Sequence, residues 1–401
     1  MSNQDDNSPK NPTGLNRREL IQLGAAAGAG TFLAGIPGAE AARTPQVPRR
    51  VLGKTGKKIP ILLFGGAVRL DSVFDHKLAE AMRYGVNYFD AARMYGGGRC
   101  EANISAYLKR AKNRKKIWLT SKSMLHDPAD FKGQLAITLK ELNTSYVDMY
   151  FLHALKQKRY LNAKMGKMAY QLKRSGKMRH VGFSCHNGNV VELLNEAAKH
   201  SWIDAIMFKY NFRSFGDKAL NKAIDACARK GIGLIAMKTQ GAATSFAGKV
   251  KKFKQTGKWT QHQAVLKAVW SDPRITASVS AMKTMGQLRQ NIGAAVNKSK
   301  LTSLETNELN RYAMATRNVS CDGCDHICNA RVNAPVQIGD TMRFLMYHDS
   351  YGEPDKARAL YRGLPASARN LAGVDFKAAS AACPHGLDVG GLMLRAGEVL
   401  G

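Results

Sequence analysis

Four polar side chains of different chemistry stand at the ends of three consecutive apolar runs, or within a few residues of them. They are Asp90, Tyr95, Lys122 and His153. A phenol with an ordinary pKa of about 10 is a poor acid at neutral pH, and a neighbouring ammonium group lowers that pKa. With a carboxylate to orient the ammonium group and an imidazole to hydrogen-bond a carbonyl oxygen, the set predicts proton donation to an alkoxide that forms as hydride reaches carbon.

Each of these residues also has a purely structural interpretation. Asp90 and Lys122 would form a buried ion pair, Tyr95 would be a loop aromatic residue, and His153 would be a core histidine. For any one residue the structural interpretation is the commoner one. Four such residues at three successive run ends favour the catalytic interpretation.

Four of the seven cysteines form a second set with possible chemistry. Cys321, Cys324 and Cys328 follow a C-x₂-C-x₃-C pattern, and Cys383 comes much later in "AACPHGLDV". Four thiolates suit either Zn²⁺ or a [4Fe–4S] cluster, and a terminal Cys-Pro favours the cluster. Disulfides are a third alternative, although an odd cysteine count argues against a complete disulfide framework.

The elements that must position the first set alternate between short apolar runs and longer amphipathic stretches. Eight strands are predicted, at 61–65, 86–90, 117–121, 147–153, 179–184, 203–209, 232–237 and 275–280. Near-continuous apolar strands separated by helices imply a parallel sheet, and eight such units predict a (β/α)₈ barrel. A doubly wound open sheet is the competing architecture, but "FGGAVRLDS" after the first strand lacks the GxGxxG spacing.

The barrel prediction also explains why the four polar side chains would meet. In a barrel, catalytic groups gather at the C-terminal ends of the strands, and adjacent strands lie about 4.8 Å apart. Asp90, Lys122 and His153 fall at three successive strand ends, and Tyr95 lies in the loop after the first of them. We therefore expect all four in one small volume.

This constellation resembles the aldo-keto reductase family, through the stretches "GVNYFDAARMYGGG", "IWLTSKS", "VDMYFLH", "GKMRHVGFS" and "GIGLIAMK". The resemblance covers roughly residues 50–295 and assigns a barrel domain to 50–300. It implies that Tyr95 is the general acid, that Lys122 lowers its pKa, that Asp90 holds Lys122, and that His153 orients the carbonyl. The implied reaction interconverts an aldehyde or ketone and an alcohol with NADP(H).

The resemblance is only partial where the cofactor would bind. The family usually has Ser-Asn after the fifth strand, whereas this chain has Ser184 followed by Cys185, and the usual Gln of the sixth strand falls at Met207. Lys283 is the residue implied to meet the 2′-phosphate, and Asn291 the one implied to meet adenine. NADP(H) binding through Ser184, Lys283 and Asn291 is therefore a hypothesis.

Both ends of the chain point to a particular subset of the family. Arg17 and Arg18 precede a weakly apolar Ala/Gly-rich run, and "AEA" at 39–41 matches a cleavage site, so residues 1–41 resemble a twin-arginine export signal. The "CPHGLDV" stretch resembles the end of ferredoxin-type ligation, which implies a helical, four-cysteine iron–sulfur module at 301–401. The twin-arginine route exports proteins already folded with their cofactors, so we expect a periplasmic protein.

The formal net charge of +31 raises the question of nucleic acid or an anionic membrane as partner. The Lys and Arg residues form no long block and no strip interleaved with aromatic residues, so we expect no nucleic-acid partner and no stable membrane span. We expect a small carbonyl or alcohol substrate and, with a cluster present, a possible external redox partner. The alternative is a catalytically silent barrel whose zinc- or cluster-stabilised module acts in binding or electron transfer.

Overall fold

The computed structural model of the protein describes residues 44–241, 258–315, 321 and 323–401. The export signal predicted at 1–41 therefore lies outside the described residues. Residues Pro45–Gly401 form one compact unit. This unit contains both the repeated strands and helices and the cysteine-rich C-terminal segment.

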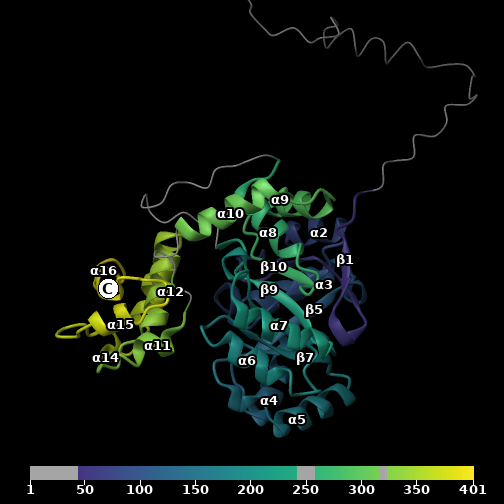
Figure 1. The fold of residues 1–401 in the computed structure, drawn as a ribbon. Coiled ribbons are helices and arrows are strands. Elements are labelled where there is room, and N and C mark those ends of the chain that lie inside the picture. Colours follow the sequence, from purple (N-terminus) through teal and green to yellow (C-terminus); the bar gives the residue numbers. More distant parts are fainter. Residues whose placement is uncertain (1–43, 242–257, 316–320, 322) are drawn as a thin grey trace, which may run out of the picture. The chain divides into compact units, whose positions relative to one another are not determined.

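Eight parallel strands close into a barrel in sequence order, which confirms the (β/α)₈ prediction and excludes the open doubly wound sheet (Figure 1). They are β3 (Leu62–Gly65), β4 (Tyr88–Asp90), β5 (Trp118–Ser123), β6 (Val147–Leu152), β7 (Met178–Cys185), β8 (Ala205–Lys209), β9 (Gly233–Met237) and β10 (Ala277–Ser280). β10 pairs with β3 and so closes the ring. The predicted strand ends agree with the observed ones to within about two residues, the usual uncertainty of such boundaries.

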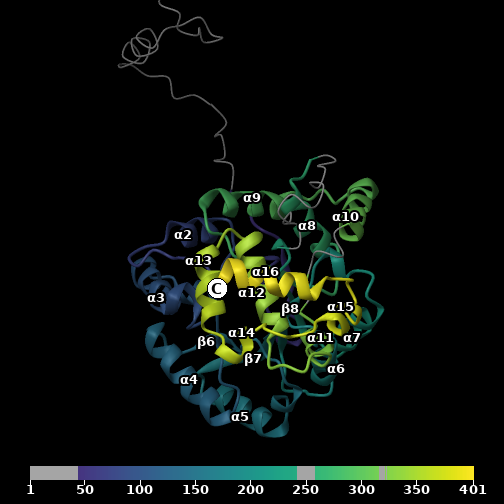
Figure 2. The ribbon, with the colours of Figure 1, turned by 90° about the vertical axis from the view of Figure 1, so that its left-hand side faces the viewer.

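Within the described ranges, eight helices follow the barrel strands, and Figure 2 shows them arranged around the strands. They are α2 (His76–Arg83), α3 (Cys100–Ala111), α4 (Pro128–Glu141), α5 (Ala163–Arg174), α6 (Val190–Ala197), α7 (Lys218–Arg229), α8 (Gln261–Trp270) and α9 (Met285–Val296). Several begin at a side chain that accepts a backbone N–H, among them Asp75, Asn162 and Asp217. Thr260 and Gln263 form a complete capping box at the start of α8.

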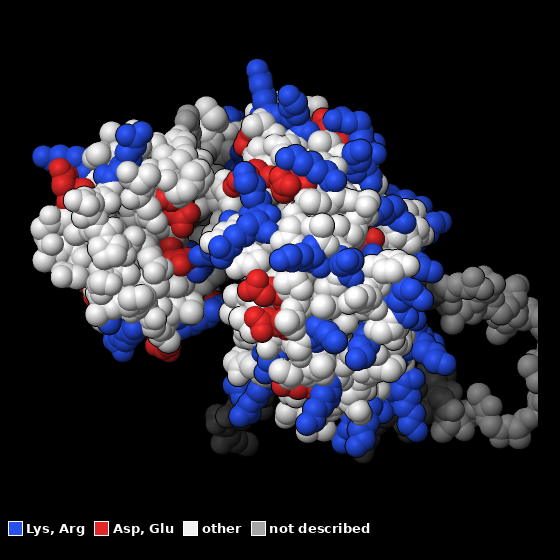
Figure 3. Space-filling view, turned by 90° about the horizontal axis from the view of Figure 1, so that it is seen from below, with Lys and Arg blue, Asp and Glu red and all other residues white. Residues whose placement is uncertain are grey.

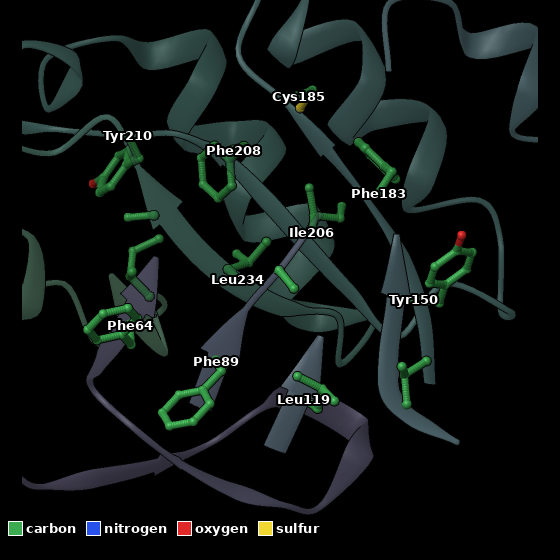
Figure 4. Close-up of a cluster of buried hydrophobic side chains, with 14 of the residues drawn as sticks. Phe64, Phe89, Leu119, Tyr150, Phe183, Cys185, Ile206, Phe208, Tyr210 and Leu234 are labelled. Carbon is green, nitrogen blue, oxygen red and sulfur yellow. The ribbon is translucent and has the colours of Figure 1, made fainter. Parts of the chain in front are cut away.

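The strands are apolar on both faces because each face packs against a different layer. Phe89, Phe183, Phe208 and Leu234 belong to the cluster between strands and helices, and Figure 4 shows them projecting from β4 and from the three neighbouring strands β7, β8 and β9. Tyr88, Phe151, Met207 and Ile235 fill the inside of the barrel in a second cluster. Burial on both faces explains why the strands read as continuous apolar runs rather than as alternating ones.

A short antiparallel hairpin precedes the barrel and was not predicted from the sequence. It consists of β1 (Arg49–Val51) and β2 (Lys58–Pro60). Leu52 and Ile59 of this hairpin are fully buried in the cluster inside the barrel. Gly53 is required in the turn, because its φ is +45° and an added Cβ would lie 2.2 Å from the carbonyl oxygen of Gly231. The hairpin therefore packs into the barrel interior.

The chain after the barrel is helical. It contains α10 (Ser303–Ala315), α11 (Asp325–Asn329), α12 (Ile338–Asp349), α13 (Pro354–Arg362), α14 (Ala366–Arg369), α15 (Lys377–Ala381) and α16 (Val389–Leu400). Leu309 and Tyr312 of α10 share a cluster with Val265 of α8, so α10 packs on the barrel. Val336, Met342 and Met393 belong to a separate cluster that joins α12, α15 and α16.

The surface in Figure 3 carries Lys and Arg over much of the visible face, with Asp and Glu in a few smaller groups. This distribution is the structural counterpart of the net charge of +31. Among the residues that the structure describes, no helix is long and apolar enough to cross a membrane.

Candidate active site

The four residues singled out in the sequence meet at the C-terminal end of β4, β5 and β6. Asp90 ends β4, and Lys122 lies within β5, which extends to Ser123 rather than ending before the lysine as predicted. The Nζ atom of Lys122 lies 2.7 Å from Oδ1 of Asp90, and both side chains are at most 4% exposed. Lys122 also donates a hydrogen bond of 2.8 Å to the carbonyl oxygen of Ala91. The lysine is therefore held on two sides.

Tyr95 approaches this pair from the loop after β4. It begins a short 3₁₀ turn, Tyr95–Gly98, in which Gly96 and Gly97 have φ values of 58° and 67° that favour glycine. The Tyr95 hydroxyl lies 3.3 Å from Nε2 of His153, and the Lys122 Nζ lies 4.6 Å from the centre of the Tyr95 ring. The structure thus brings together all four predicted catalytic residues.

The pKa of the Tyr95 phenol is raised to about 12, which corrects the expectation of a lowered value. Burial is the largest cause, because it disfavours the phenolate; Lys122 acts in the expected direction but does not outweigh it. For Lys122, burial disfavours the ammonium form, yet Asp90 and Tyr95 together raise its pKa. At neutral pH the site therefore holds a protonated phenol beside a charged lysine.

His153 follows β6 directly and is 7% exposed. Burial is the main cause that holds its pKa well below the ordinary value, with further contributions from Lys122, His186 and His126. The imidazole is therefore neutral at physiological pH. Ala154, the next residue, has a φ of 50°, an uncommon backbone conformation for a residue other than glycine. This turn aims its N–H at Ser184, whose Oγ accepts a 3.0 Å hydrogen bond from it.

The three residues implied to bind the cofactor all have partners within the protein. Ser184 lies at the end of β7 and is buried, as is Asn291 in α9. Asn291 accepts a 2.8 Å hydrogen bond from Gln240, and Gln240 in turn accepts one of 2.8 Å from Ser280. Gln240 follows β9 and was not singled out in the sequence, because a lone glutamine carries no motif.

Unlike Ser184 and Asn291, Lys283 is exposed, and 46% of its side-chain surface is accessible to solvent. Its Nζ lies 2.6 Å from Oε1 of Glu353, which precedes α13 in the C-terminal segment. Lys283, which the family resemblance assigned to the 2′-phosphate, is therefore paired with a carboxylate from the C-terminal segment. No pattern in the sequence predicted this ion pair.

All four cysteines of the second set line one small cavity. Cys321, Cys324, Cys328 and Cys383 surround a volume of about 20 Å³, together with apolar residues such as Ile327 and Val389. All seven cysteines lie in the described residues and are free thiols, so the disulfide alternative does not describe this structure. Within the described ranges, no three His, Cys, Asp or Glu side chains are grouped closely enough to hold a metal ion.

A larger cavity, of about 130 Å³, lies between the ends of β7, β8 and β9 and the helices α11 and α12. His186, Lys209 and Lys238 line it from the barrel, and Tyr351 lines it from the C-terminal segment. The residues common to this cavity and the cysteine-lined one are Cys321, Asp325, Met342 and Leu387. The cysteine site is thus one residue layer from the barrel mouth.

Comparison with known proteins places the barrel in a family. The profile of the aldo/keto reductase family matches residues 63–313, well over half of the chain. An uncharacterized oxidoreductase of Schizosaccharomyces pombe is 29% identical over 165 residues, which are 36% of this chain and 50% of that protein. An Arabidopsis thaliana member of aldo-keto reductase family 4 is 34% identical over 106 residues, 25% of this chain and 33% of that protein. The matched segments thus span half or less of these relatives.

Solved structures show the same fold. An aldo-keto reductase from Bacillus halodurans, in its holo form, superposes with a TM-score of 0.56 at 21% identity and covers 67% of this chain and 97% of that one. An aldo-keto reductase from Klebsiella pneumoniae in complex with NADPH gives a TM-score of 0.53 at 19% identity, covering 67% and 95%. With the family profile spanning the whole barrel and the four predicted residues assembled at its mouth, this chain belongs to the aldo/keto reductase family.

Proposed function

We propose that this protein is an oxidoreductase that interconverts a carbonyl compound and an alcohol with NADP(H). One observation carries the proposal: the Tyr95 hydroxyl lies 3.3 Å from His153 Nε2, directly beside the buried Lys122–Asp90 pair. Relatives that are named as reductases add support, among them an NADP(+) aldo-keto reductase of Schizosaccharomyces pombe.

In this proposal Tyr95 donates its proton to the carbonyl oxygen of the substrate. The neutral imidazole of His153 hydrogen-bonds the same oxygen, since its Nε2 lies beside the phenol oxygen. Lys122 carries a positive charge next to Tyr95 and stabilises the phenolate that remains after proton transfer. Asp90 holds that charge in place and compensates it within a buried site.

The residues available to bind NADP(H) are compatible with a dinucleotide. They depart from the family pattern where the nicotinamide would bind. NADPH, when bound, supplies a hydride to the carbonyl carbon. Ser184, Lys283 and Asn291 are the residues that would hold it, with the Gln240 amide next to Asn291. Cys185 and Met207 are fully buried and offer no amide for a carboxamide group.

The test is direct. Purified protein is mixed with NADPH and an aromatic aldehyde, and nucleotide consumption is followed together with alcohol formation. Equal amounts of nucleotide oxidised and alcohol produced support the proposal. NADPH titration that changes neither protein fluorescence nor melting temperature, with no alcohol formed, contradicts it.

We further propose that Cys321, Cys324, Cys328 and Cys383 hold a [4Fe–4S] cluster. The support is that the four thiols line one apolar cavity and that the last of them stands in a Cys-Pro pair, which is typical of iron–sulfur ligation.

Anaerobic purification followed by iron, sulfide and zinc analysis decides between these groups. About four irons and four sulfides per chain, lost in Cys328→Ser and retained in Cys227→Ser, support the cluster. Cys227 is the matched control because it is buried in α7, away from the cysteine-lined cavity. One zinc and no iron contradict the cluster and favour a structural site.

Export through the twin-arginine route to the periplasm is part of the same proposal. It rests on Arg17, Arg18 and the small residues at 39–41. Cell fractionation of the wild-type protein and of a variant with both arginines changed to lysine tests it. The wild type is expected in the periplasm in shortened form, and the variant in the cytoplasm at full length.

One observation favours a second candidate function. Cys185 and Met207 replace the residues that grip the nicotinamide in the family pattern, which suits a catalytically silent barrel whose cysteine site serves an external redox partner. In that case the protein would form no alcohol with any nucleotide. Tyr95→Phe would then leave the metal content and the redox properties of the cysteine site unchanged.

A further inference from the structure

The end of the barrel at which its strands begin, opposite the catalytic residues, carries many exposed cations. Its surface comes from the hairpin β1–β2 and from the turns that lead from each helix into the next strand. The exposed cations that have no ion pair in the described part of the chain make up what is here termed the basic face: Lys57, Lys58, Lys112, Lys115, Lys116, Lys177, Arg229 and Lys230.

The hairpin joins two of these turns into one continuous surface. The backbone N–H of Lys54 donates a 2.5 Å hydrogen bond to the carbonyl oxygen of Gly231, in the turn before β9. On the other side of the hairpin, Arg49 donates a 2.9 Å hydrogen bond to the side chain of Asn87. The Asn87 amide in turn donates one of 2.6 Å to the carbonyl oxygen of Lys116, in the turn before β5.

A stacked aromatic ring connects the turn before β5 to the one before β7. The ring centre of Tyr146 lies 4.1 Å from the Arg114 guanidinium and 4.3 Å from that of Arg179. The backbone N–H of Val147 donates a 3.1 Å hydrogen bond to the carbonyl oxygen of Lys177. The lysines before β5 and the lysine before β7 therefore lie on one surface.

The carboxylates at this end of the barrel are already paired with cations outside the basic face. Their side chains are at most 10% exposed, and the closest pairs are Asp148 with Arg179 at 2.8 Å, Asp204 with Lys173 at 2.5 Å and Asp272 with Arg274 at 2.7 Å. The described turns at this end contain no exposed carboxylate. Figure 3 shows Lys and Arg along the edge of the barrel that lies opposite the C-terminal helices. The basic face therefore has an uncompensated positive charge.

The chain also enters the compact unit at this end. The backbone N–H of Val47 donates a 2.9 Å hydrogen bond to the carbonyl oxygen of Tyr84, in the turn before β4. The sequence at 20–36 is an uncharged, Ala/Gly-rich run that resembles the apolar part of an export signal. Because only residues 37–46 join this run to Val47, its insertion into a bilayer during the proposed export would keep this end of the barrel close to the membrane.

We propose that the basic face binds the surface of a membrane that contains anionic phospholipids. Each lysine near such a surface strengthens binding about fivefold, and this Coulombic attraction requires neither a cleft nor an exact geometry. Lysine side chains on exposed turns meet that requirement. An acidic protein or DNA would also be attracted, but the attachment of the apolar run at the same end favours the membrane. The barrel mouth lies at the other end and would face away from the bilayer.

The test measures sedimentation of the full chain with vesicles of phosphatidylcholine that contain about 30% phosphatidylglycerol. A variant that combines Lys115→Gln, Lys116→Gln and Lys177→Gln is expected to bind about 100-fold more weakly than the wild type. The matched control changes three exposed lysines to Gln near the beginnings of α4, α5 and α7, at the opposite end of the barrel: Lys132, Lys164 and Lys218. Both variants keep residues 1–43, so any binding through that segment is the same in the two.

Three outcomes of this comparison would overturn the inference. They are equal binding of the wild type to vesicles of pure phosphatidylcholine, equal losses in the two triple variants, and tighter binding to DNA than to the anionic vesicles at the same ionic strength. Release of the wild type at about 1 M salt supports the inference, because the Debye length falls to about 3 Å there.

Labelling of the wild type identifies the face that meets the bilayer. With anionic vesicles present, Lys57, Lys115 and Lys177 are expected to be protected from acetylation, whereas Lys164 and Lys218 react as they do in the free protein. Equal protection at both ends of the barrel would contradict the basic face. Neither experiment requires turnover, so a protein that reduces no carbonyl compound still tests this inference.

Discussion

The Nζ atom of Lys283 lies 2.6 Å from the Oε1 atom of Glu353, so an ion pair links the loop after β10 to the C-terminal helices. Glu353 also pairs with Lys356 at 2.8 Å. Burial alone would raise the pKa of the Glu353 carboxyl, but hydrogen bonds from the two lysines outweigh it and hold that pKa below its usual range. The cation assigned to the 2′-phosphate thus already has an anionic partner.

Removal of the Glu353 charge is expected to strengthen NADPH binding. In Glu353→Gln, no carboxylate at this position competes with the nucleotide phosphate for Lys283. Exposed ion pairs contribute up to about 1 kcal/mol of free energy, which corresponds to a factor of about five in Kd. Fluorescence titration measures the Kd values for NADPH and NADH. Asp355→Asn is the matched control, because Asp355 is 99% exposed on the next helix. An equal gain for NADH would contradict a role at the 2′-phosphate.

Replacement of Tyr95 by Phe is expected to lower kcat for carbonyl reduction by about 10²- to 10⁴-fold, the usual contribution of a positioned general acid. The ring still packs against His153 and Lys122, so the melting temperature is expected to stay close to that of the wild type. Tyr84→Phe, at the end of the outer helix α2, is the control and should retain full activity. Comparable activity in the two variants would remove Tyr95 from the chemistry.

The buried Lys122–Asp90 pair is expected to show strong coupling in a double-mutant cycle. Lys122→Met or Asp90→Asn alone leaves one buried charge without its partner, which typically costs about 3–5 kcal/mol of unfolding free energy. The double variant leaves no such charge and is expected to be more stable than either single variant. Urea denaturation of the four proteins measures the coupling. Additive losses would show that the two side chains contribute independently.

Acid is expected to destabilise the folded protein through His186. The folded-state pKa of this histidine is about 3, whereas an unfolded-chain histidine titrates at about 6.5. Below pH 6.5 or so the unfolded chain therefore binds more protons, and the unfolding free energy falls as the pH decreases toward the folded-state value. His186→Gln should show a shallower loss of stability between these two values than the wild type does. Identical pH dependence in both proteins would contradict the assigned pKa.

Much of the fold could be predicted because its signal is local. Most barrel strands are short runs of apolar residues that are buried on both faces, and the turns between strands and helices carry recognisable caps. The hairpin β1–β2 escaped prediction because its strands have three residues each, too few to show any periodicity. Leu52 and Ile59 are apolar like many loop residues, and only the closed barrel gives them an interior to fill.

The catalytic residues were predictable for a related reason. Strand ends are visible in the sequence, and parallel strands in a barrel bring successive ends to the same rim, so Asp90, Lys122 and His153 had to meet. The direction of the Tyr95 pKa shift was not predictable in this way. It depends on how completely the surrounding atoms exclude water, and here burial outweighs the charge of Lys122.

By itself, the sequence determined the barrel, the four residues at its mouth and the grouping of the cysteines, because each depends on spacing along the chain. Only the tertiary structure decided that Glu353 holds Lys283, that Gln240 holds Asn291 and that the Lys238 ammonium group lies beside the rings of Tyr347 and Tyr351. These contacts join residues far apart in the chain through single side chains, and no periodic pattern encodes them. Their energies depend on local burial and geometry, which exist only once the barrel and the C-terminal helices have folded.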